Sequence, residues 1–258
     1  MVAPLAALSV ALLGVYPGNF ALKFDPLHGD IVRVPHESSM AGPLIDSFTV
    51  ELWLLAQPRA QLAPEEGRVV NLIGFPGRHP FVGLASDTGC AVVQLKLANG
   101  SWYSYEGTTP VDDGEWHHIA ATWDGTSEEA SERELALYVD GVLEQSGGED
   151  DDATDVPKTP EALGYTVVRT CSDGLCEEGM HVGGLYCCSG GGYTGRFLNG
   201  TIDELRVWTR ALSPKELTDK MRTPLAAGDE QGLLFYFPLD EAVREHSRRT
   251  HRSGADLA

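Results

Sequence analysis

Residues 114–125, GEWHHIAATWDG, decide how the rest of the chain is interpreted. Two tryptophans, two adjacent histidines and an aspartate in so short a stretch could belong to a metal or catalytic site. On a β-strand, however, successive side chains point to opposite faces, so His117 and His118 diverge while the apolar residues after them share a face. We therefore interpret the stretch as a core strand that ends in a turn at Asp124, with one histidine near the core and the other facing solvent.

The same alternation of apolar and polar residues recurs along most of the chain, and long helical periodicity is nearly absent. One helix is expected over 213–222, where Ser213, Pro214 and Glu216 form the pattern of a capping box. Many short strands with turn signals between them predict a two-sheet antiparallel jelly-roll sandwich, all-β apart from that helix. Strands are expected at 20–24, 30–35, 47–56, 68–75, 81–86, 90–100, 101–107, 116–125, 180–185, 200–212 and 232–242. A hairpin of two strands is expected over 133–146, with a tight turn at Asp140-Gly141.

Composition narrows the range of partners. The chain has 258 residues, 42% of them hydrophobic, which suits one large all-β domain with a buried core. Its formal charge of −19 disfavours nucleic acid and anionic membranes, because both attract clustered Lys and Arg. The only basic cluster is the short stretch 244–252. Excess carboxylate is compatible with calcium, which takes oxygen ligands.

The first residues form an apolar run that is too short to span a bilayer. Residues 1–17 are therefore a signal peptide or a first strand, and 18–258 form a single domain. The glycosylation sequons at Asn99 and Asn199 favour the secretory route, so we expect a secreted or extracellular protein.

Four cysteines crowd into or beside an acidic insertion around 147–179 that interrupts the strand pattern. Their spacing is not that of a structural zinc site, and in a secreted chain disulfides are expected, with the pairing left open. These residues are Cys171, Cys176, Cys187 and Cys188. The fifth cysteine, Cys90, lies on a predicted strand and is expected to be a buried free thiol.

Four motifs in order resemble laminin-G-like domains of the concanavalin A-like lectin/glucanase superfamily. They are ALKFD with DIVRVP (21–35), SFTVELWL (47–54), the stretch 114–125 with LALYVDGVL (135–143), and GTIDELRVWTRALSPKEL (200–217). The resemblance implies a jelly roll of two antiparallel sheets that binds carbohydrate or protein ligands outside cells. Many such domains are modules of larger proteins, and some hold a calcium ion at the rim of the sandwich.

Two aspartates are candidate calcium ligands. In relatives that hold calcium, the aspartate of the IDE motif resembles Asp203, and Asp25 is a second candidate at the turn after the opening strand. A carboxylate on a sheet strand must be paired, hydrogen-bonded or metal-bound, because an isolated buried charge is costly. The alternative is that Asp203 only accepts hydrogen bonds from backbone amides.

Aromatic side chains are the candidates for stacking on a sugar. Trp102, Tyr103, Tyr105 and Tyr193 lie in Gly- and Ser-rich stretches and could be exposed. The other tryptophans occupy strand positions and are expected to pack. These are Trp53, Trp116, Trp123 and Trp208.

Hydrolysis of glycosides is not expected. It needs two carboxyl groups close together, and on one strand that requires acids at alternate positions. Asp203 and Glu204 are adjacent, so they point to opposite faces. The sequence thus predicts a non-catalytic, secreted recognition or adhesion module for a glycan or an extracellular protein. A glycoside hydrolase and a purely structural domain of a larger extracellular protein are the alternatives.

Overall fold

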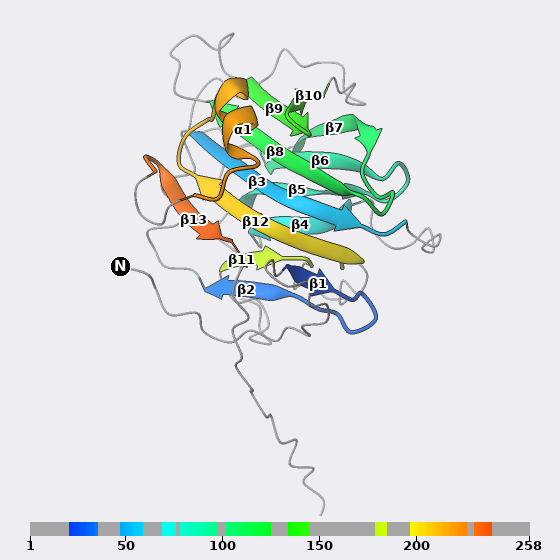
Figure 1. The fold of residues 1–258 in the computed structure, drawn as a ribbon. Coiled ribbons are helices and arrows are strands. Elements are labelled where there is room, and N and C mark those ends of the chain that lie inside the picture. The colour runs from blue at the N-terminus through cyan, green and yellow to red at the C-terminus, as the bar shows by residue number, and fades with distance from the viewer. Residues whose placement is uncertain are drawn as a thin grey trace, which may run out of the picture.

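The computed structural model describes residues 21–35, 47–58, 69–75, 78–96, 102–124, 134–144, 179–184, 197–225 and 230–238. In these residues the chain forms thirteen strands and one helix, and the helix is not long and apolar enough to cross a membrane. The strands make two sheets that face each other (Figure 1). The predicted all-β sandwich with one short helix is confirmed.

One sheet has seven strands in the order β1-β12-β3-β8-β9-β10, and β13 pairs with β12 beside this path. All its strand pairs are antiparallel. Its strands are β1 (Leu22–Phe24), β3 (Ser47–Ala56), β8 (Trp116–Asp124), β9 (Glu134–Val139), β10 (Val142–Leu143), β12 (Gly200–Trp208) and β13 (Leu233–Phe237).

The second sheet has six strands in the order β2-β11-β4-β5-β6-β7, again all antiparallel. Its strands are β2 (Val32–Pro35), β4 (Val69–Phe75), β5 (Arg78–Ala85), β6 (Cys90–Lys96), β7 (Trp102–Pro110) and β11 (Gly179–Val182). Neighbours β2 and β11 are far apart in sequence, as a jelly roll requires.

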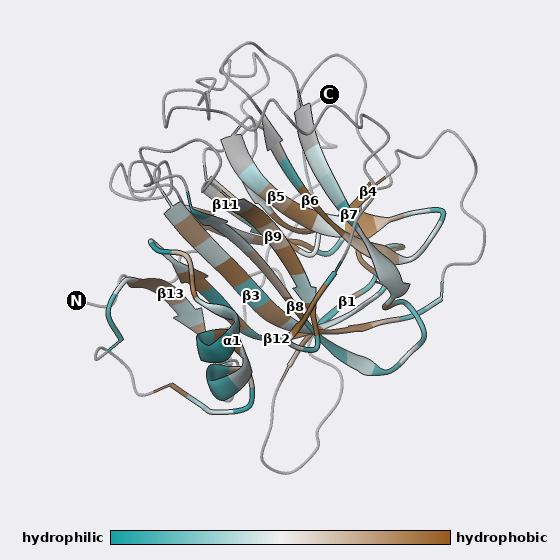
Figure 2. Ribbon diagram, turned by 90° about the horizontal axis from the view of Figure 1, so that it is seen from above, coloured by the Kyte–Doolittle hydropathy of each residue, from teal (hydrophilic) through white to brown (hydrophobic). Residues whose placement is uncertain are grey.

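The core lies between the two sheets. From β3, alternate residues point inward, and Phe48, Val50, Leu52 and Leu54 are all at most 1% exposed. The opposite sheet contributes apolar residues of β4, β5 and β6 to the same cluster. Figure 2 shows the hydrophobic stretches of both sheets, with the hydrophilic surface of the helix outside them. Alternation on β3 therefore predicted the buried face correctly.

Helix α1 (Pro214–Lys220) covers the outer face of the seven-stranded sheet. Its Leu217 is buried in a second apolar cluster that includes Tyr138 and Trp208. The capping box is present: Ser213 accepts a hydrogen bond from the amide of Glu216, and Glu216 accepts one from the amide of Ser213. An ion pair with Arg210 and these hydrogen bonds lower the pKa of Glu216 to about 2.

A buried carboxylate joins the two sheets at their β7 and β10 edges. Glu144, directly after β10, accepts hydrogen bonds from the amides and hydroxyls of Thr108 and Thr109 on β7, over 2.5–3.1 Å. Burial alone would raise the pKa of Glu144, but these four donors outweigh it and lower the pKa. Because the donors favour the charged form, the contact stabilises the fold only while Glu144 is ionised.

Replacing Glu144 with Gln should reduce the free energy of unfolding at pH 7 by about 1–3 kcal/mol, because amide hydrogens would meet hydrogen-bond donors. The folded-state pKa is lowered, so the stabilisation is present above the unfolded value of 4.5 and is lost as the pH falls through the folded value. Urea unfolding across this range should show the difference closing in acid. Glu115→Gln, at an exposed position, is the control. A difference independent of pH would contradict the prediction.

Candidate functional site

One end of the sandwich gathers turns from both sheets. Strand register places Phe24 opposite Gly200, Gly200 opposite Ala56, and Leu55 opposite Trp116. The loop 111–115 links this end to the other sheet, since Val111 donates to the carbonyl of Gly89 and Gly114 donates to that of Ala56. We call this end the Asp112 rim; it comprises residues 25–30, 57, 86–89, 111–117, 140–141 and 197–199.

A small pocket of about 10 Å³, room for roughly one water molecule, opens at the Asp112 rim. Its apolar floor is formed by Ala56, Leu84, Ala85 and Leu198. Its polar lining comes from Gln57, Gly89, Asp112 and Asn199. Its carboxylate and amide groups can form hydrogen bonds with one polar group of a ligand that lies on the rim.

Gly89 lets the Asp112 carboxylate lie over the backbone. A Cβ atom at this position would come within 2.0 Å of Asp112 Oδ1, and Gly89 also has a φ of +71°. Side chains are therefore disfavoured here both by space and by backbone conformation. Within the part of the chain that the structure describes, Asp112 is half-buried and its carboxylate has no hydrogen-bond or ion-pair partner.

The loop that carries Asp112 is held by its neighbour Asp113. Asp113 Oδ1 accepts a hydrogen bond from the amide of Glu115 and lies 3.3 Å from Nε2 of His117. The other ring nitrogen of His117, Nδ1, lies 2.9 Å from Oδ2 of Asp140. Burial lowers the pKa of His117, but the hydrogen bonds and charges of Asp140 and Asp113 outweigh burial and raise it.

These groups do not form a metal site. The two nitrogens of His117 face different carboxylates on opposite sides of the ring, so no ion can bind all three side chains. Across the described ranges, no three His, Cys, Asp or Glu side chains are placed to hold a metal ion.

The predicted calcium ligands lie apart. Asp203 is half-buried within β12, opposite Trp53, and its Oδ1 accepts a hydrogen bond from the amide of Glu204. Asp25 follows β1 at the Asp112 rim, where its carboxylate accepts from the amide of Leu27 and lies beside His28. Among the described residues, neither aspartate belongs to a group of three or more His, Cys, Asp or Glu side chains that could hold a metal ion. Calcium binding stays a prediction for the whole chain.

The predicted aromatic residues that the structure describes, Trp102, Tyr103 and Tyr105, lie on β7 and not at the Asp112 rim. Trp102 and Tyr103 begin β7 at the opposite end of the sandwich, and their side chains are not among those described. Tyr105 is half-buried and packs against the main core. Tyr193 lies outside the described residues. Trp116 was expected to pack but is 42% exposed, because it is the first residue of β8 and lies at the rim.

The remaining predicted residues divide in two groups. Asn199 is exposed at the mouth of the pocket, and Cys90 is a buried free thiol as predicted. The others lie outside the described residues, as do residues 1–17 and most of the insertion around 147–179. They are Asn99, Cys171, Cys176, Cys187 and Cys188.

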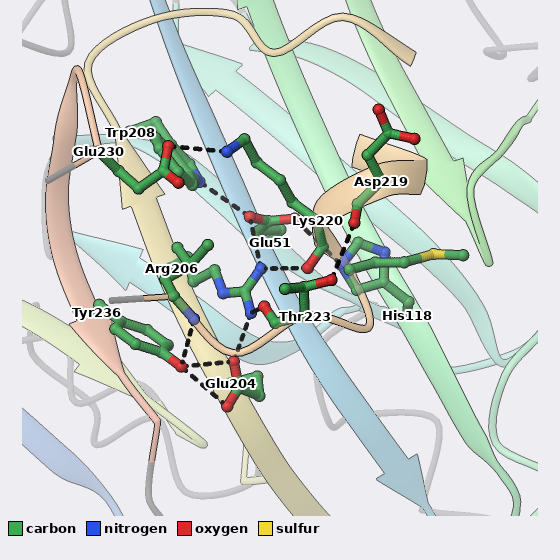
Figure 3. Close-up of polar contacts among 12 residues, drawn as sticks. Glu51, His118, Glu204, Arg206, Trp208, Asp219, Lys220, Thr223, Glu230 and Tyr236 are labelled. Atoms are coloured by element: carbon green, nitrogen blue, oxygen red, sulfur yellow. Dashed lines mark hydrogen bonds and ion pairs between the residues drawn. The ribbon is translucent and has the colours of Figure 1, made fainter. Parts of the chain in front are cut away.

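A second polar cluster is buried beneath α1 (Figure 3). Glu51 of β3 is 0% exposed, and its Oε1 accepts a hydrogen bond of 3.0 Å from the indole of Trp208. Nε2 of His118 lies 3.2 Å from the other oxygen of Glu51, and Nη1 of Arg206 lies 3.6 Å from the first. Strands β3, β8 and β12 thus each contribute to one buried charge cluster.

Arg206 also fixes the end of α1. Its guanidinium donates to the carbonyls of Lys220 and Thr223, each at 2.9 Å, and pairs with Glu204, which accepts from the hydroxyl of Tyr236. The indole of Trp53 donates to the carbonyl of Met221 at 2.7 Å. Glu51, His118 and Arg206 are closed to a ligand, so we assign this cluster to the scaffold.

The pocket residues Gln57, Gly89 and Asp112 were not predicted from the sequence. A signal was present in the pair Asp112-Asp113 just before the strand motif, but pattern alone does not separate the two aspartates. Only the fold shows that Asp112 lines the pocket while Asp113 faces His117.

The family is established by a match over more than half of the chain. The model of the concanavalin A-like lectin/glucanases superfamily matches residues 28–175. The chain belongs to this superfamily. The resemblance seen in the sequence is therefore confirmed. No curated protein matches the chain.

Solved structures support the same fold. A protein from Bacteroides ovatus that is proposed to bind carbohydrate has a TM-score of 0.55 and 19% identity, over 87% of this chain and 52% of that one. The CBM40 of the Ruminococcus gnavus IT-sialidase has a TM-score of 0.50 and 13% identity, over 78% and 95%.

The binding domain of Paraclostridial Mosquitocidal Protein 1 also has a TM-score of 0.50, with 14% identity over 77% of this chain and 42% of that one. The chain spans about half the length of the Bacteroides ovatus protein and less than half of the mosquitocidal one. At these identities the likenesses establish the fold alone.

Replacing Arg206 with Met should destabilise the fold by roughly 3–5 kcal/mol, because it leaves the Glu51 carboxylate buried without its cation. It also removes two donors from the end of α1, so amide exchange in the helix should rise. Chemical denaturation and hydrogen exchange measure the two effects. Lys215→Met, at an exposed position of α1, should change little. Equal stability of the two variants would show that the buried cluster is not a structural constraint.

The pH dependence of stability tests the contacts of His117. Because the folded-state pKa is raised above 6.5, His117 stabilises the fold fully below that value and loses this effect as pH rises through the folded value. His117→Gln should therefore cost up to about 1 kcal/mol at pH 5.5 and less at pH 8.5, since its partners are half-exposed. Thermal unfolding at both pH values measures the difference; a larger cost at pH 8.5 would refute the assignment.

Proposed function

We propose that this chain is a non-catalytic glycan-recognition module that binds a saccharide at the Asp112 rim. The observation that carries the proposal is the half-buried Asp112 carboxylate, which lines a pocket and has no partner in the described part of the chain. A half-exposed carboxylate that no protein donor occupies is free to accept hydrogen bonds from a ligand in place of water. Sugar hydroxyls can donate such hydrogen bonds.

The rest of the lining suits the same ligand. The side-chain amides of Gln57 and Asn199 can both donate to and accept from hydroxyl groups. Trp116, exposed at the same rim, is available to stack on a further sugar unit of a longer chain.

Binding without hydrolysis is favoured by the single acid of the pocket. Among the described lining residues, Asp112 alone is a carboxylic acid. Glycoside hydrolysis uses a pair of carboxyl groups about 5–10 Å apart. The buried pair Glu51 and Glu204, which meets at Arg206, does not supply it, because Glu51 is fully buried beneath α1.

The secretory route and calcium dependence belong to the proposal as separate parts. The side chain of Asn199 is exposed where a glycosylation enzyme could reach it, but a glycan there would stand at the mouth of the pocket. Calcium would need ligands in addition to Asp25 or Asp203, such as backbone carbonyls. Binding measured with calcium and with a chelator, on protein with and without the Asn199→Gln substitution, separates these parts.

Glycan-array binding followed by calorimetry tests the proposal. Wild-type protein should bind at least one saccharide class, and Asp112→Ala should weaken that binding about tenfold, the loss of one or two hydrogen bonds to a charged group. Asp219→Ala, an exposed acid of α1 outside the pocket, is the matched control and should bind as wild type. Unchanged affinity in Asp112→Ala, or hydrolysis of a bound saccharide, would refute the proposal.

A further inference from the structure

We propose that His117 is a pH-dependent link, which holds loop 111–115 to the β9–β10 turn while its ring is protonated and releases the loop once the ring is neutral. The loop carries Asp112, so the link sets how freely the segment around this residue moves. This role is independent of saccharide binding. It follows from the two carboxylates between which the ring lies.

The ring of His117 joins two acids from different parts of the chain. Its Nδ1 lies 2.9 Å from Oδ2 of Asp140, in the β9–β10 turn, and its Nε2 lies 3.3 Å from Oδ1 of Asp113, in the loop. An ionised carboxylate only accepts hydrogen bonds, whereas a protonated imidazole donates from both nitrogens. Both contacts are therefore satisfied together only when each ring nitrogen carries a proton.

A neutral ring can keep one of the two contacts. It has a single N–H, and its other nitrogen presents a lone pair to a carboxylate oxygen. Asp140 offers the shorter contact and is fixed in place, because its Oδ1 accepts from the amide of His118 and its own amide donates to the carbonyl of His118, each at 2.8 Å. The remaining proton therefore stays on Nδ1, and the contact that is lost is the one with Asp113.

The release is confined to the middle of the loop. The amides of Val111 and Gly114 donate to backbone carbonyls outside the loop, and these bonds do not depend on the charge of His117. Asp113 lies between these two residues, and its Oδ1 also accepts from the amide of Glu115 at 2.9 Å. Without the ring contact, Asp113 is tied through this bond to its own loop, so the segment between the two anchors gains freedom.

Charged groups on the surrounding elements have contacts of their own. Within the loop, Asp112 lies over Gly89 and Glu115 is exposed. Beyond it, the charged groups on the elements next to β8 or packed on its sheet are engaged elsewhere. Glu51 on β3 faces His118 and Arg206, Glu144 after β10 accepts from Thr108 and Thr109, and on α1 Lys215 pairs with Asp219 and Lys220 with Glu230.

The direction of the switch follows from these charges. Burial lowers the pKa of His117, but Asp140 and Asp113 outweigh burial and raise the pKa above 6.5. The loop is therefore held at pH values below the folded-state pKa and is released as the pH rises through it. A histidine with this pKa changes its charge within the range that proteins meet in and around cells.

NMR spectroscopy of the full chain tests the link. Ring chemical shifts give the pKa of His117, and hydrogen exchange of the Gly114 and Glu115 amides, relative to the intrinsic rate at each pH, reports on the loop. From pH 5.5 to 8.5 the protection of both amides should fall about two- to fivefold, as for a partly exposed ion pair, with its midpoint at the pKa of His117. The amide of Gly89, which donates to Ala85 outside the loop, should show constant protection.

Two isosteric variants with the same net charge separate the link from the general acidity of the chain. Asp113→Asn keeps an oxygen for the amide of Glu115 but removes the negative charge that faces Nε2. It should lower the pKa of His117 and abolish the pH dependence of loop protection. Asp87→Asn, at an exposed position in a neighbouring turn, should leave both unchanged.

Two results would overturn the inference. The first is loop protection in the wild-type protein that does not follow the titration of His117, and this measurement requires no variant to fold. The second is an equal effect of Asp113→Asn and Asp87→Asn, which would assign the pKa of His117 to general acidity. Neither result bears on saccharide binding, which the glycan array tests separately.

Discussion

The buried carboxylate of Glu51 is the constraint on which the seven-stranded sheet depends. A charged group with no exposed surface is tolerated only when it has polar or charged partners. Glu51 has three such partners: the indole of Trp208, the imidazole of His118 and the guanidinium of Arg206. They belong to β12 and β8, on either side of β3. A slip of either strand by one residue would turn its partners to the other face and leave Glu51 unpaired. The register of the three central strands and the charge cluster therefore depend on each other.

This register also positions the rim. Loop 111–115 runs directly into β8, so fixing His118 against Glu51 fixes where the loop begins its path to the other sheet. The amide of Val111 donates to the carbonyl of Gly89, beside the six-stranded sheet, and the amide of Gly114 donates to that of Ala56 in the seven-stranded sheet. Asp112, which lies between them, has its backbone set by two anchored neighbours. The scaffold thus holds the side chain of Asp112 at one place, as the proposed binding role requires.

The sequence predicted the parts of this structure that repeat a local pattern. Alternation identified the buried face of β3, and a capping pattern at Ser213 and Glu216 placed α1 correctly. Contacts between strands were not predicted, because Glu51 and Arg206 are far apart in the chain and neither forms a motif alone. The bulge in β12 was missed as well: Glu204 has a φ of +49° and pairs with Arg206, which simple alternation does not anticipate. Trp116 was misjudged because a strand pattern does not show where the sandwich ends.

Asp112 and Glu51 show how one chemical group serves two purposes in this fold. Both are carboxylates removed at least partly from water, and both therefore need donors. The donors near Glu51 belong to the protein, so its interactions hold neighbouring strands together. Asp112 has none within the described chain, yet Gly89 leaves room for it over the backbone. Because Asp112 is half-exposed, water can serve as its donor, and a ligand that displaces this water must bring donors of its own, which is why hydroxyl groups suit the proposed site.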